Sequence, residues 1–291
     1  MVPRFVAGPP GTGKTHGFLV DKYREGFLNY DPDKIVLLSH TKTASNQIIE
    51  AILDMSEVKE KGLDADYFKD RICTIHHFCR SKIMKKEVFE NGAEDFNALC
   101  AKDSAFRAAK FIGDPYKNHP FFKFISHAHG RDLSNDLEAH YRTCADRREY
   151  NPYNFNQLQK LNYVYTKYKK DTRQHDFADM LNEFNSLDNV KDKRLDIEML
   201  IVDEAQDCNR PQLRAINKIA QNVKDEHFYM VGDPDQTIFE FAGSDADYFH
   251  KLSAKPYLEL DQGKRCSKAV NDYCKEIIAP IWIEYGYTRK W

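Results

Sequence analysis

The stretch Gly8-Pro9-Pro10-Gly11-Thr12-Gly13-Lys14-Thr15 fits the pattern G-x-x-x-x-G-K-[ST] in full. A short apolar run, residues 5–7, precedes it and a helical pattern follows, which is the strand, loop and helix context that this pattern requires. The glycines let successive backbone N–H groups point at phosphate oxygens, and the start of the following helix adds a partial positive charge. We therefore predict a nucleoside triphosphate site. The alternative is a surface turn rich in glycine and proline.

Two side chains of this loop have specific expected roles. Lys14 is expected to reach the β and γ phosphates, and the Thr15 hydroxyl is expected to bind Mg²⁺. The remaining residues of the stretch, Gly8, Pro9, Pro10, Gly11, Thr12 and Gly13, complete the predicted cofactor-binding loop.

The bulk composition indicates a globular protein of one large or two moderate domains. The chain has 291 residues, of which 42% are hydrophobic and 30% are charged, and its formal net charge is -2. Nucleic acid would therefore have to bind in a local groove, since the overall charge is not basic. The seven cysteines form no C-x-x-C pair, and the sequence shows neither a signal peptide nor a membrane span. We expect a cytoplasmic protein without a zinc site.

Apolar runs alternate with helical patterns along much of the chain. After the loop, strands are expected at 35–38, 71–75, 198–202, 227–231 and 257–260. Helices are expected between them, including residues 211–222 and a segment from 267 to about 278. Such alternation implies a mostly parallel sheet with ligands at the carboxyl ends of the strands. From about residue 80 to 171 the strand-like runs stop and helical spacing dominates, which predicts a helical insertion.

Chemically suggestive residues follow two of these strands. Asp203 is placed to hold Mg²⁺ opposite Thr15, and Glu204 to orient and deprotonate the water that attacks the γ phosphate. Without the loop, this pair would be read as an acidic turn at a strand end. After the next strand, Gln236 could sense the γ phosphate, and Phe239 and Phe241 could stack on bases or simply pack in the core.

The chain resembles the UvrD/Rep-like branch of superfamily 1 DNA helicases. The resemblance lies in stretches that occur in the family's order: GPPGTGKT, SHTKTASNQI, TIHHFC, DFADML, IVDEAQD, VGDPDQTIFEFAGS and LDQGKRCS. Members of this family are ATP-driven motors that move along single-stranded DNA in the 3′ to 5′ direction. The resemblance implies ATP and Mg²⁺ as cofactors and single-stranded DNA as a partner.

The resemblance also implies a division of the chain. Residues 1–79 and 176–256 would form a RecA-like motor domain, with 80–175 as an inserted all-helical accessory subdomain. Residues 257–291 would begin a second RecA-like domain. The expected fold class is therefore α/β, a P-loop NTPase with a RecA-like parallel sheet and a helical insertion.

By position, the family's residue roles can be assigned to this chain. Lys14, Glu204 and Gln236 take the catalytic nucleotide roles, together with Arg265, which matches an arginine that reaches the γ phosphate from the second motor domain. Arg265 could otherwise be a surface residue at the start of a helix. The residues that match DNA-contacting positions are His40, Thr41, Lys42, His76, Phe78, Phe239 and Phe241. Aromatic faces suit this role because stacking does not depend on which base is bound.

The resemblance ends at about the start of the second motor domain. We expect the N-terminal portion of a DNA helicase, with part of its ATP site supplied by a missing region or a second polypeptide. The helix that carries Val270, Tyr273 and Ile277 would then expose an apolar face. The competing interpretation is an ATP-binding regulatory or interaction module without motor activity. A small-molecule kinase fits less well, because no arginine-bearing lid is recognisable.

Overall fold

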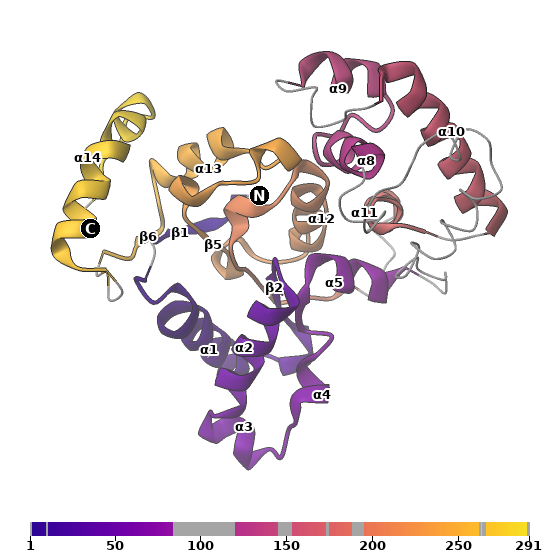
Figure 1. Cartoon of the computed structure of the whole chain (residues 1–291). Coiled ribbons are helices and arrows are strands. Elements are labelled where there is room, and N and C mark those ends of the chain that lie inside the picture. The colour runs from indigo at the N-terminus through magenta and orange to yellow at the C-terminus, as the bar shows by residue number, and fades with distance from the viewer. Residues whose placement is uncertain are drawn as a thin grey trace.

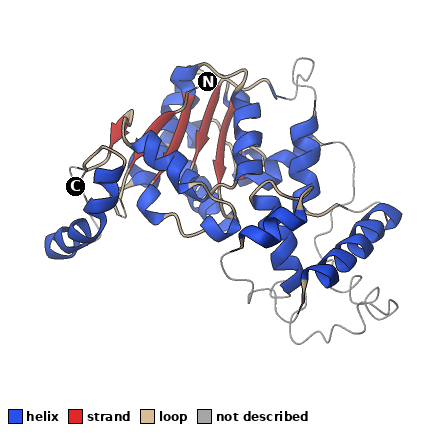
Figure 2. Ribbon diagram, turned by 90° about the horizontal axis from the view of Figure 1, so that it is seen from above, coloured by secondary structure: helices blue, strands red, loops and turns tan. Residues whose placement is uncertain are grey.

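The computed structural model describes residues 2–9, 11–83, 120–144, 153–172, 175–187, 195–261, 263 and 266–289. Within these residues the chain forms an α/β fold around a six-stranded parallel sheet (Figures 1 and 2). The strands, in chain order, are β1 (Arg4–Ala7), β2 (Ile35–Ser39), β3 (Ile72–Thr74), β4 (Met199–Val202), β5 (Phe228–Gly232) and β6 (Leu258–Glu259). The predicted fold class is confirmed.

The sheet order is β3-β2-β4-β5-β1-β6, so strands distant in sequence lie side by side. Strand β1 lies between β5 and β6, with Phe5 opposite Met230 and Ala7 opposite Glu259. Because all strands are parallel, their carboxyl ends lie at one edge of the sheet. The phosphate loop follows β1 and the acidic pair follows β4, so both lie at this edge.

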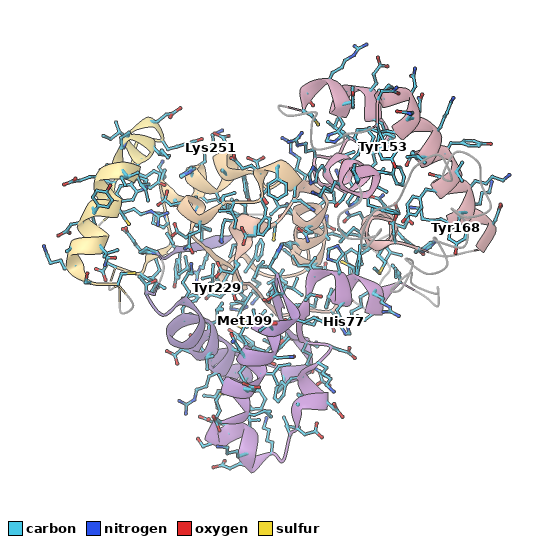
Figure 3. All side chains as sticks on the ribbon, viewed as in Figure 1. His77, Tyr153, Tyr168, Met199, Tyr229 and Lys251 are labelled. Carbon is cyan, nitrogen blue, oxygen red and sulfur yellow. The ribbon has the colours of Figure 1, made fainter. Side chains whose placement is uncertain are left out.

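Alternation of side chains along the strands divides the core between two faces of the sheet. On one face, Val36 and Leu200 pack with helices α5 (Ile75–Lys82), α11 (Phe177–Ser186), α12 (Arg210–Ala220) and α13 (Ala246–Ser253). On the other face, Met199 and Tyr229 lie in the interior with α1 (Val20–Asn29), α2 (Lys42–Leu53), α3 (Ser56–Glu60) and α4 (Ala65–Phe68) (Figure 3). The sheet is therefore covered on both sides.

A group of helices lies apart from the sheet and has its own core. It consists of α8 (Pro120–Gly130), α9 (Leu137–Thr143) and α10 (Phe155–Thr172), at the upper right of Figure 1. Phe121, Phe124, Leu158 and Tyr165 are buried together between α8 and α10. The described residues between 120 and 172 contain helices and no strand, in agreement with a helical insertion. The exact domain boundaries remain predictions.

The last helix, α14 (Lys268–Glu284), begins near its predicted start and continues through Pro280 past its predicted end. It lies to one side of the sheet in Figure 1. One face packs through Trp282, which is 4% exposed, whereas Tyr273 and Ile277 are 66% and 60% exposed. The expected exposed apolar face is confirmed. In the part of the chain that the structure describes, no helix combines the length and the apolar character needed to cross a membrane.

Candidate nucleotide and DNA binding site

The phosphate loop connects β1 to a π-helical turn, Lys14–Leu19, that leads directly into α1. Gly11 and Gly13 have φ angles of 77° and 84°, which non-glycine residues rarely adopt. The Gly8 N–H donates to the Gly232 carbonyl at 3.2 Å and fastens the loop to β5. These features fit the predicted wrapping of backbone around phosphates. Pro10 lies outside the described residues.

Lys14 and Glu204 meet across this edge of the sheet. The lysine is 8% exposed, and its Nζ lies 3.7 Å from Glu204 Oε2. Glu204 lies two residues after the end of β4 at Val202, and its φ of 46° is left-handed, which turns its side chain toward the loop. The predicted lysine and carboxylate are thus neighbours, although they are 190 residues apart in the chain.

Asp203 is the more deeply buried of the two carboxylates. Its side chain accepts a hydrogen bond from the Glu204 N–H at 3.0 Å, and the residue is 3% exposed. Burial, followed by the neighbouring Glu204, raises the pKa of Asp203 to about 7. A buried carboxylate whose charged form is disfavoured by its surroundings suits a divalent cation. The Thr15 side chain, the second predicted Mg²⁺ ligand, lies outside the described atoms.

Gln206 joins the acidic pair to the next strand, a role that we did not predict. Its Nε2 donates to Glu204 Oε2 at 3.0 Å, and its Oε1 accepts from the Asp233 N–H at 3.1 Å. A Cβ on Gly232 would lie 2.4 Å from Gln206 Oε1, so a larger residue at this strand end would displace the glutamine amide from its present position. The glutamine of the DEAQD stretch is the sequence feature from which this role could have been predicted.

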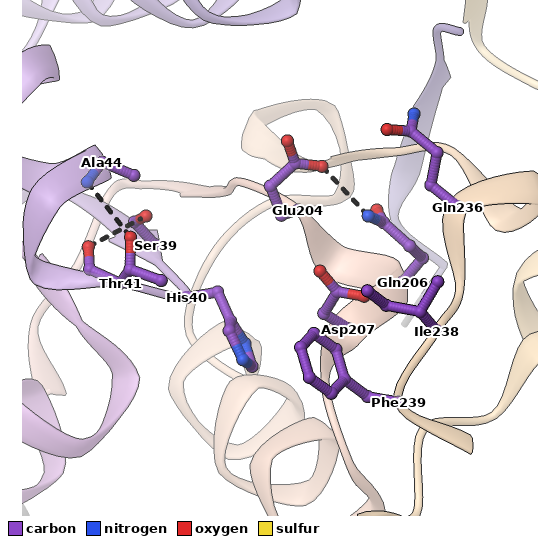
Figure 4. A pocket seen from close by; sticks show the side chains of 10 residues that line it. All are labelled: Ser39, His40, Thr41, Ala44, Glu204, Gln206, Asp207, Gln236, Ile238 and Phe239. Carbon is purple, nitrogen blue, oxygen red and sulfur yellow. Dashed lines mark hydrogen bonds between the residues drawn. The ribbon is translucent and has the colours of Figure 1, made fainter. Parts of the chain in front are cut away.

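Gln236 lies in a short helical turn after β5, Pro234–Gln236. Its Nε2 donates to Asp233 Oδ2 at 2.7 Å. Together with Glu204 and Gln206 it lines a hollow of about 260 Å³, shown in Figure 4. Hydrogen bonds therefore connect the predicted catalytic carboxylate, through Gln206 and Asp233, to the predicted γ-phosphate glutamine.

The same hollow is lined by residues predicted to contact DNA. His40 and Phe239 face each other across it, and their rings stack with centroids 5.7 Å apart and planes 25° apart (Figure 4). Burial lowers the pKa of His40, so the ring is less readily protonated than an exposed histidine. The structure thus places two of the predicted base-stacking rings beside the predicted nucleotide residues.

The other predicted DNA residues differ in how accessible they are. Phe241 is 48% exposed, and its ring lies 5.3 Å from that of His127 on α8. Thr41 caps α2 by accepting a hydrogen bond from Ala44 N–H, and Lys42 is exposed in the first turn. These side chains lie near the hollow and can meet a ligand.

The TIHHFC stretch is less accessible. His76 packs edge-on against Phe177, with ring centroids 5.2 Å apart, and burial lowers its pKa to about 4. Phe78 is 1% exposed and packs against Phe184 in the core. A ring buried in this way cannot stack on a base, so we omit Phe78 from the proposed DNA contacts. Arg265 lies outside the described residues.

The loop, the buried lysine and the acidic pair at the ends of parallel strands define a P-loop nucleotide-binding domain. Comparison with known families places it more narrowly: a model of the UvrD/REP helicase N-terminal domain matches residues 2–256. The chain belongs to this family of helicases. The predicted resemblance is thereby confirmed.

The chain is also similar to two curated proteins. The chain is 25% identical over 300 residues to a protein named "Probable DNA helicase II homolog" from Mycoplasma capricolum subsp. capricolum. A shorter match, 40% identical over 79 residues, is to "RecBCD enzyme subunit RecB" from Buchnera aphidicola subsp. Schizaphis graminum. These alignments cover 94% and 26% of this chain but only 38% and 6% of the relatives. The chain thus corresponds to less than two fifths of either relative.

Proposed function

We propose that this chain is the nucleotide-binding motor portion of an ATP-dependent single-stranded DNA translocase or helicase that moves 3′ to 5′. The observation that carries the proposal is the juxtaposition of two sets of residues. Lys14, Glu204 and Gln236 lie at one edge of the sheet, and the His40 and Phe239 rings line the same hollow as the last two. A change at the γ phosphate that moves Glu204 or Gln236 would therefore also move the neighbouring rings that are proposed to bind DNA.

Each nucleotide-site residue has a proposed role. The glycine loop and Lys14 bind the phosphates, while Asp203 and Thr15 hold Mg²⁺, which neutralises charge on the phosphate oxygens when bound. Glu204 orients and deprotonates the attacking water, and Gln236 senses the γ phosphate. Arg265 is proposed to act from the opposite side of the cleft, where a planar guanidinium can spread positive charge over the transferring group.

The proposed DNA contacts are His40, Thr41, Lys42, His76, Phe239 and Phe241. His40, Phe239 and Phe241 supply aromatic or imidazole faces at or near the hollow, while Lys42 supplies a cationic group for a phosphate. A motor that passes any sequence needs contacts of this kind, because neither stacking nor phosphate pairing reads the base.

Turnover of ATP with and without single-stranded DNA tests the proposal. In the wild type we expect DNA to stimulate turnover. Lys14→Ala should abolish nucleotide binding and turnover, whereas Glu204→Gln should retain binding and lose at least about a hundredfold in turnover. Leu28→Ala, an exposed apolar residue at the end of α1, is the matched control and should behave as wild type. Tight ATP binding with no response to DNA would contradict the motor proposal.

That result would favour a second function, an ATP-binding interaction module. The exposed face of α14 favours it, since Val270, Tyr273 and Ile277 are each about half exposed or more. Apolar surface of this kind commonly marks a contact with another domain or protein. A second polypeptide that completes the ATP site would satisfy both proposals. We keep the cytoplasm as the proposed compartment, because the cysteines of the described residues are free.

A further inference from the structure

A buried arginine near the end of α14 contacts the residues that precede Gln236. The Arg289 side chain is 2% exposed. Its Nη1 lies 2.8 Å from Asp233 Oδ1, and its Nη2 lies 3.5 Å from Asp235 Oδ2. The guanidinium thus spans two aspartates of the short turn that carries Gln236, although more than fifty residues separate them in sequence.

The Asp233 carboxylate is shared between the arginine and the glutamine. Its Oδ1 faces Arg289, while its Oδ2 accepts the 2.7 Å hydrogen bond from Gln236 Nε2. Its backbone N–H in turn donates to Gln206, which also contacts Glu204. A continuous set of polar contacts therefore runs from the C-terminal segment to the proposed catalytic carboxylate.

A second contact fixes the other aspartate. Trp282 Nε1, on α14, donates to both oxygens of Asp235, at 3.1 and 2.9 Å. The Tyr287 hydroxyl contacts His250 Nδ1 on α13 at 2.8 Å, and both residues are buried. The C-terminal segment is thus held against the Gln236 turn at specific polar points, while Tyr273 and Ile277 remain exposed along α14.

Such an arrangement is costly as a source of stability alone. Removing a guanidinium and two carboxylates from water costs several kcal/mol per ion, and a well-packed apolar replacement is often as stable. The contribution of Arg289 is to fix the positions of the two aspartate side chains. Without Arg289, the neighbouring Asp233 and Asp235 carboxylates would keep their neutral N–H donors but lose the guanidinium between them, so that their mutual repulsion in this buried site would no longer be offset.

We infer that Arg289 is a positioning residue for Gln236: by holding the Asp233 carboxylate, it fixes the amide that meets the γ phosphate. The position of the C-terminal segment is thereby coupled to discrimination between nucleoside triphosphate and diphosphate. This inference rests on the proposed function of Gln236. Arg289 itself contacts neither nucleotide nor DNA in this scheme.

The test uses Arg289→Gln, Arg289→Lys and Trp282→Phe in the full chain. The matched control is Ile283→Ala. Ile283 lies on α14 next to Trp282, is 71% exposed, and its side chain makes none of the polar contacts described above. Helix content by circular dichroism confirms that each variant retains its fold. Two readouts follow, one without nucleotide and one with it.

The first readout is amide hydrogen exchange in the nucleotide-free protein. The N–H groups of Gln236 and Thr237 donate to Asp233 and Pro234 carbonyls at 3.0 and 3.1 Å. Arg289→Gln should raise their exchange rates by about tenfold or more, and Trp282→Phe by less, since it leaves Asp233 paired. Unchanged rates in Arg289→Gln would overturn the inference.

The second readout is the ratio of the affinities for ATP and ADP, measured with Mg²⁺. Arg289→Gln should lower the preference for ATP by about tenfold, because the hydrogen bond from the Gln236 amide to the γ phosphate is lost. The affinity for ADP, which has no γ phosphate, should stay within about twofold. Arg289→Lys should recover part of the preference. Equal weakening of ATP and ADP would show a merely structural role and overturn the inference.

The two readouts separate the inference from the proposed function. If wild-type protein binds neither nucleotide, the proposed function fails, and hydrogen exchange alone decides whether Arg289 positions the turn. If ATP binds and DNA stimulates turnover but the variants match the control, the proposed function stands and the inference falls.

Discussion

Glu204 combines an unfavourable backbone with a central chemical position. Its φ of 46° places it in the left-handed region, where a side chain costs of the order of 1 kcal/mol. This conformation directs its carboxylate to within 3.7 Å of Lys14. Strain at such a position is understandable if the carboxylate is needed for chemistry.

We therefore predict opposite effects of one substitution on stability and activity. Glu204→Gly should raise the free energy of unfolding by about 0.5–1 kcal/mol, because glycine adopts positive φ without penalty, and should abolish ATP turnover. Chemical denaturation and a phosphate-release assay measure the two effects. As a control, Glu204→Gln should lose turnover without gaining stability. A Gly variant that is less stable than wild type would contradict the assignment of strain.

The rings proposed to stack on DNA bases give a second prediction for single residues. His40→Ala and Phe241→Ala should each weaken binding of single-stranded DNA by about tenfold, since stacking contributes roughly 1–3 kcal/mol per base. Their affinity for ATP should remain nearly the same, which fluorescence titrations with labelled nucleotide and DNA can measure. Leu28→Ala again serves as the control. Unchanged DNA affinity in both variants would refute the assigned DNA path.

At the scale of elements, a close backbone contact joins the helical group, α8 to α10, to the segment that carries Phe241. Gly130, the last residue of α8, packs on Gly243, which follows a short helical turn, Glu240–Ala242. A Cβ on Gly130 would lie 1.8 Å from the Ala242 carbonyl oxygen. Arg214 on α12 and Asp132 after α8 form an ion pair nearby. The helical group is thus fixed to the segment that presents Phe241.

This contact predicts a position-specific cost for one methyl group. Gly130→Ala should lower the free energy of unfolding by about 1–3 kcal/mol, because the backbone of the neighbouring segment must shift. DNA affinity should fall as well, since Phe241 moves with that segment. Gly17→Ala is the stability control: a Cβ there meets nothing within 4 Å, so it should be neutral or stabilising. Chemical denaturation monitors both variants, and equal stabilities would contradict the prediction.

The strands and the site residues at their ends were largely predictable from sequence. Apolar runs such as 35–38 are bounded by polar residues, and the spacing in the phosphate loop is highly specific. Contacts that depend on packing at a distance were not predictable. Neither Arg289 nor the approach of Gly130 to Gly243 has a local signal, and the burial of Phe78 follows from its position on α5 against α11. The left-handed φ of Glu204 likewise required the structure.

For the molecule as a whole, several buried histidines predict sensitivity to acid. Burial lowers the pKa of His76 and of His140 to about 4, and it also lowers that of His129. For His140, burial is followed in effect by the nearby Arg131 and His127. A histidine whose pKa is lower in the folded state favours folding above its ordinary pKa of 6.5, and this stability is lost as pH falls toward 4.

The unfolding free energy should therefore fall between pH 7 and pH 5. His140 alone accounts for about 2 kcal/mol of this loss, from the difference between the two pKa values. His140→Leu should flatten the dependence by that amount, whereas the control Leu28→Ala, at an exposed apolar residue, should leave it unchanged. Denaturation series at the two pH values measure the slopes. An equally steep slope in His140→Leu would contradict the depressed pKa.

The order of strands in the sheet determines when the phosphate loop can fold during synthesis. Strand β1, which carries the phosphate loop, finds its hydrogen-bonding neighbours only in β5 and β6, more than two hundred residues later. The loop therefore cannot take its final shape until β5 and β6 have been synthesised, although its own sequence emerges from the ribosome long before theirs. Contacts of such long range slow folding and leave the first strand unpaired meanwhile. A growing chain should consequently bind nucleotide only after β5 and β6 have paired with β1. The onset of nucleotide binding therefore reports when the sheet is complete.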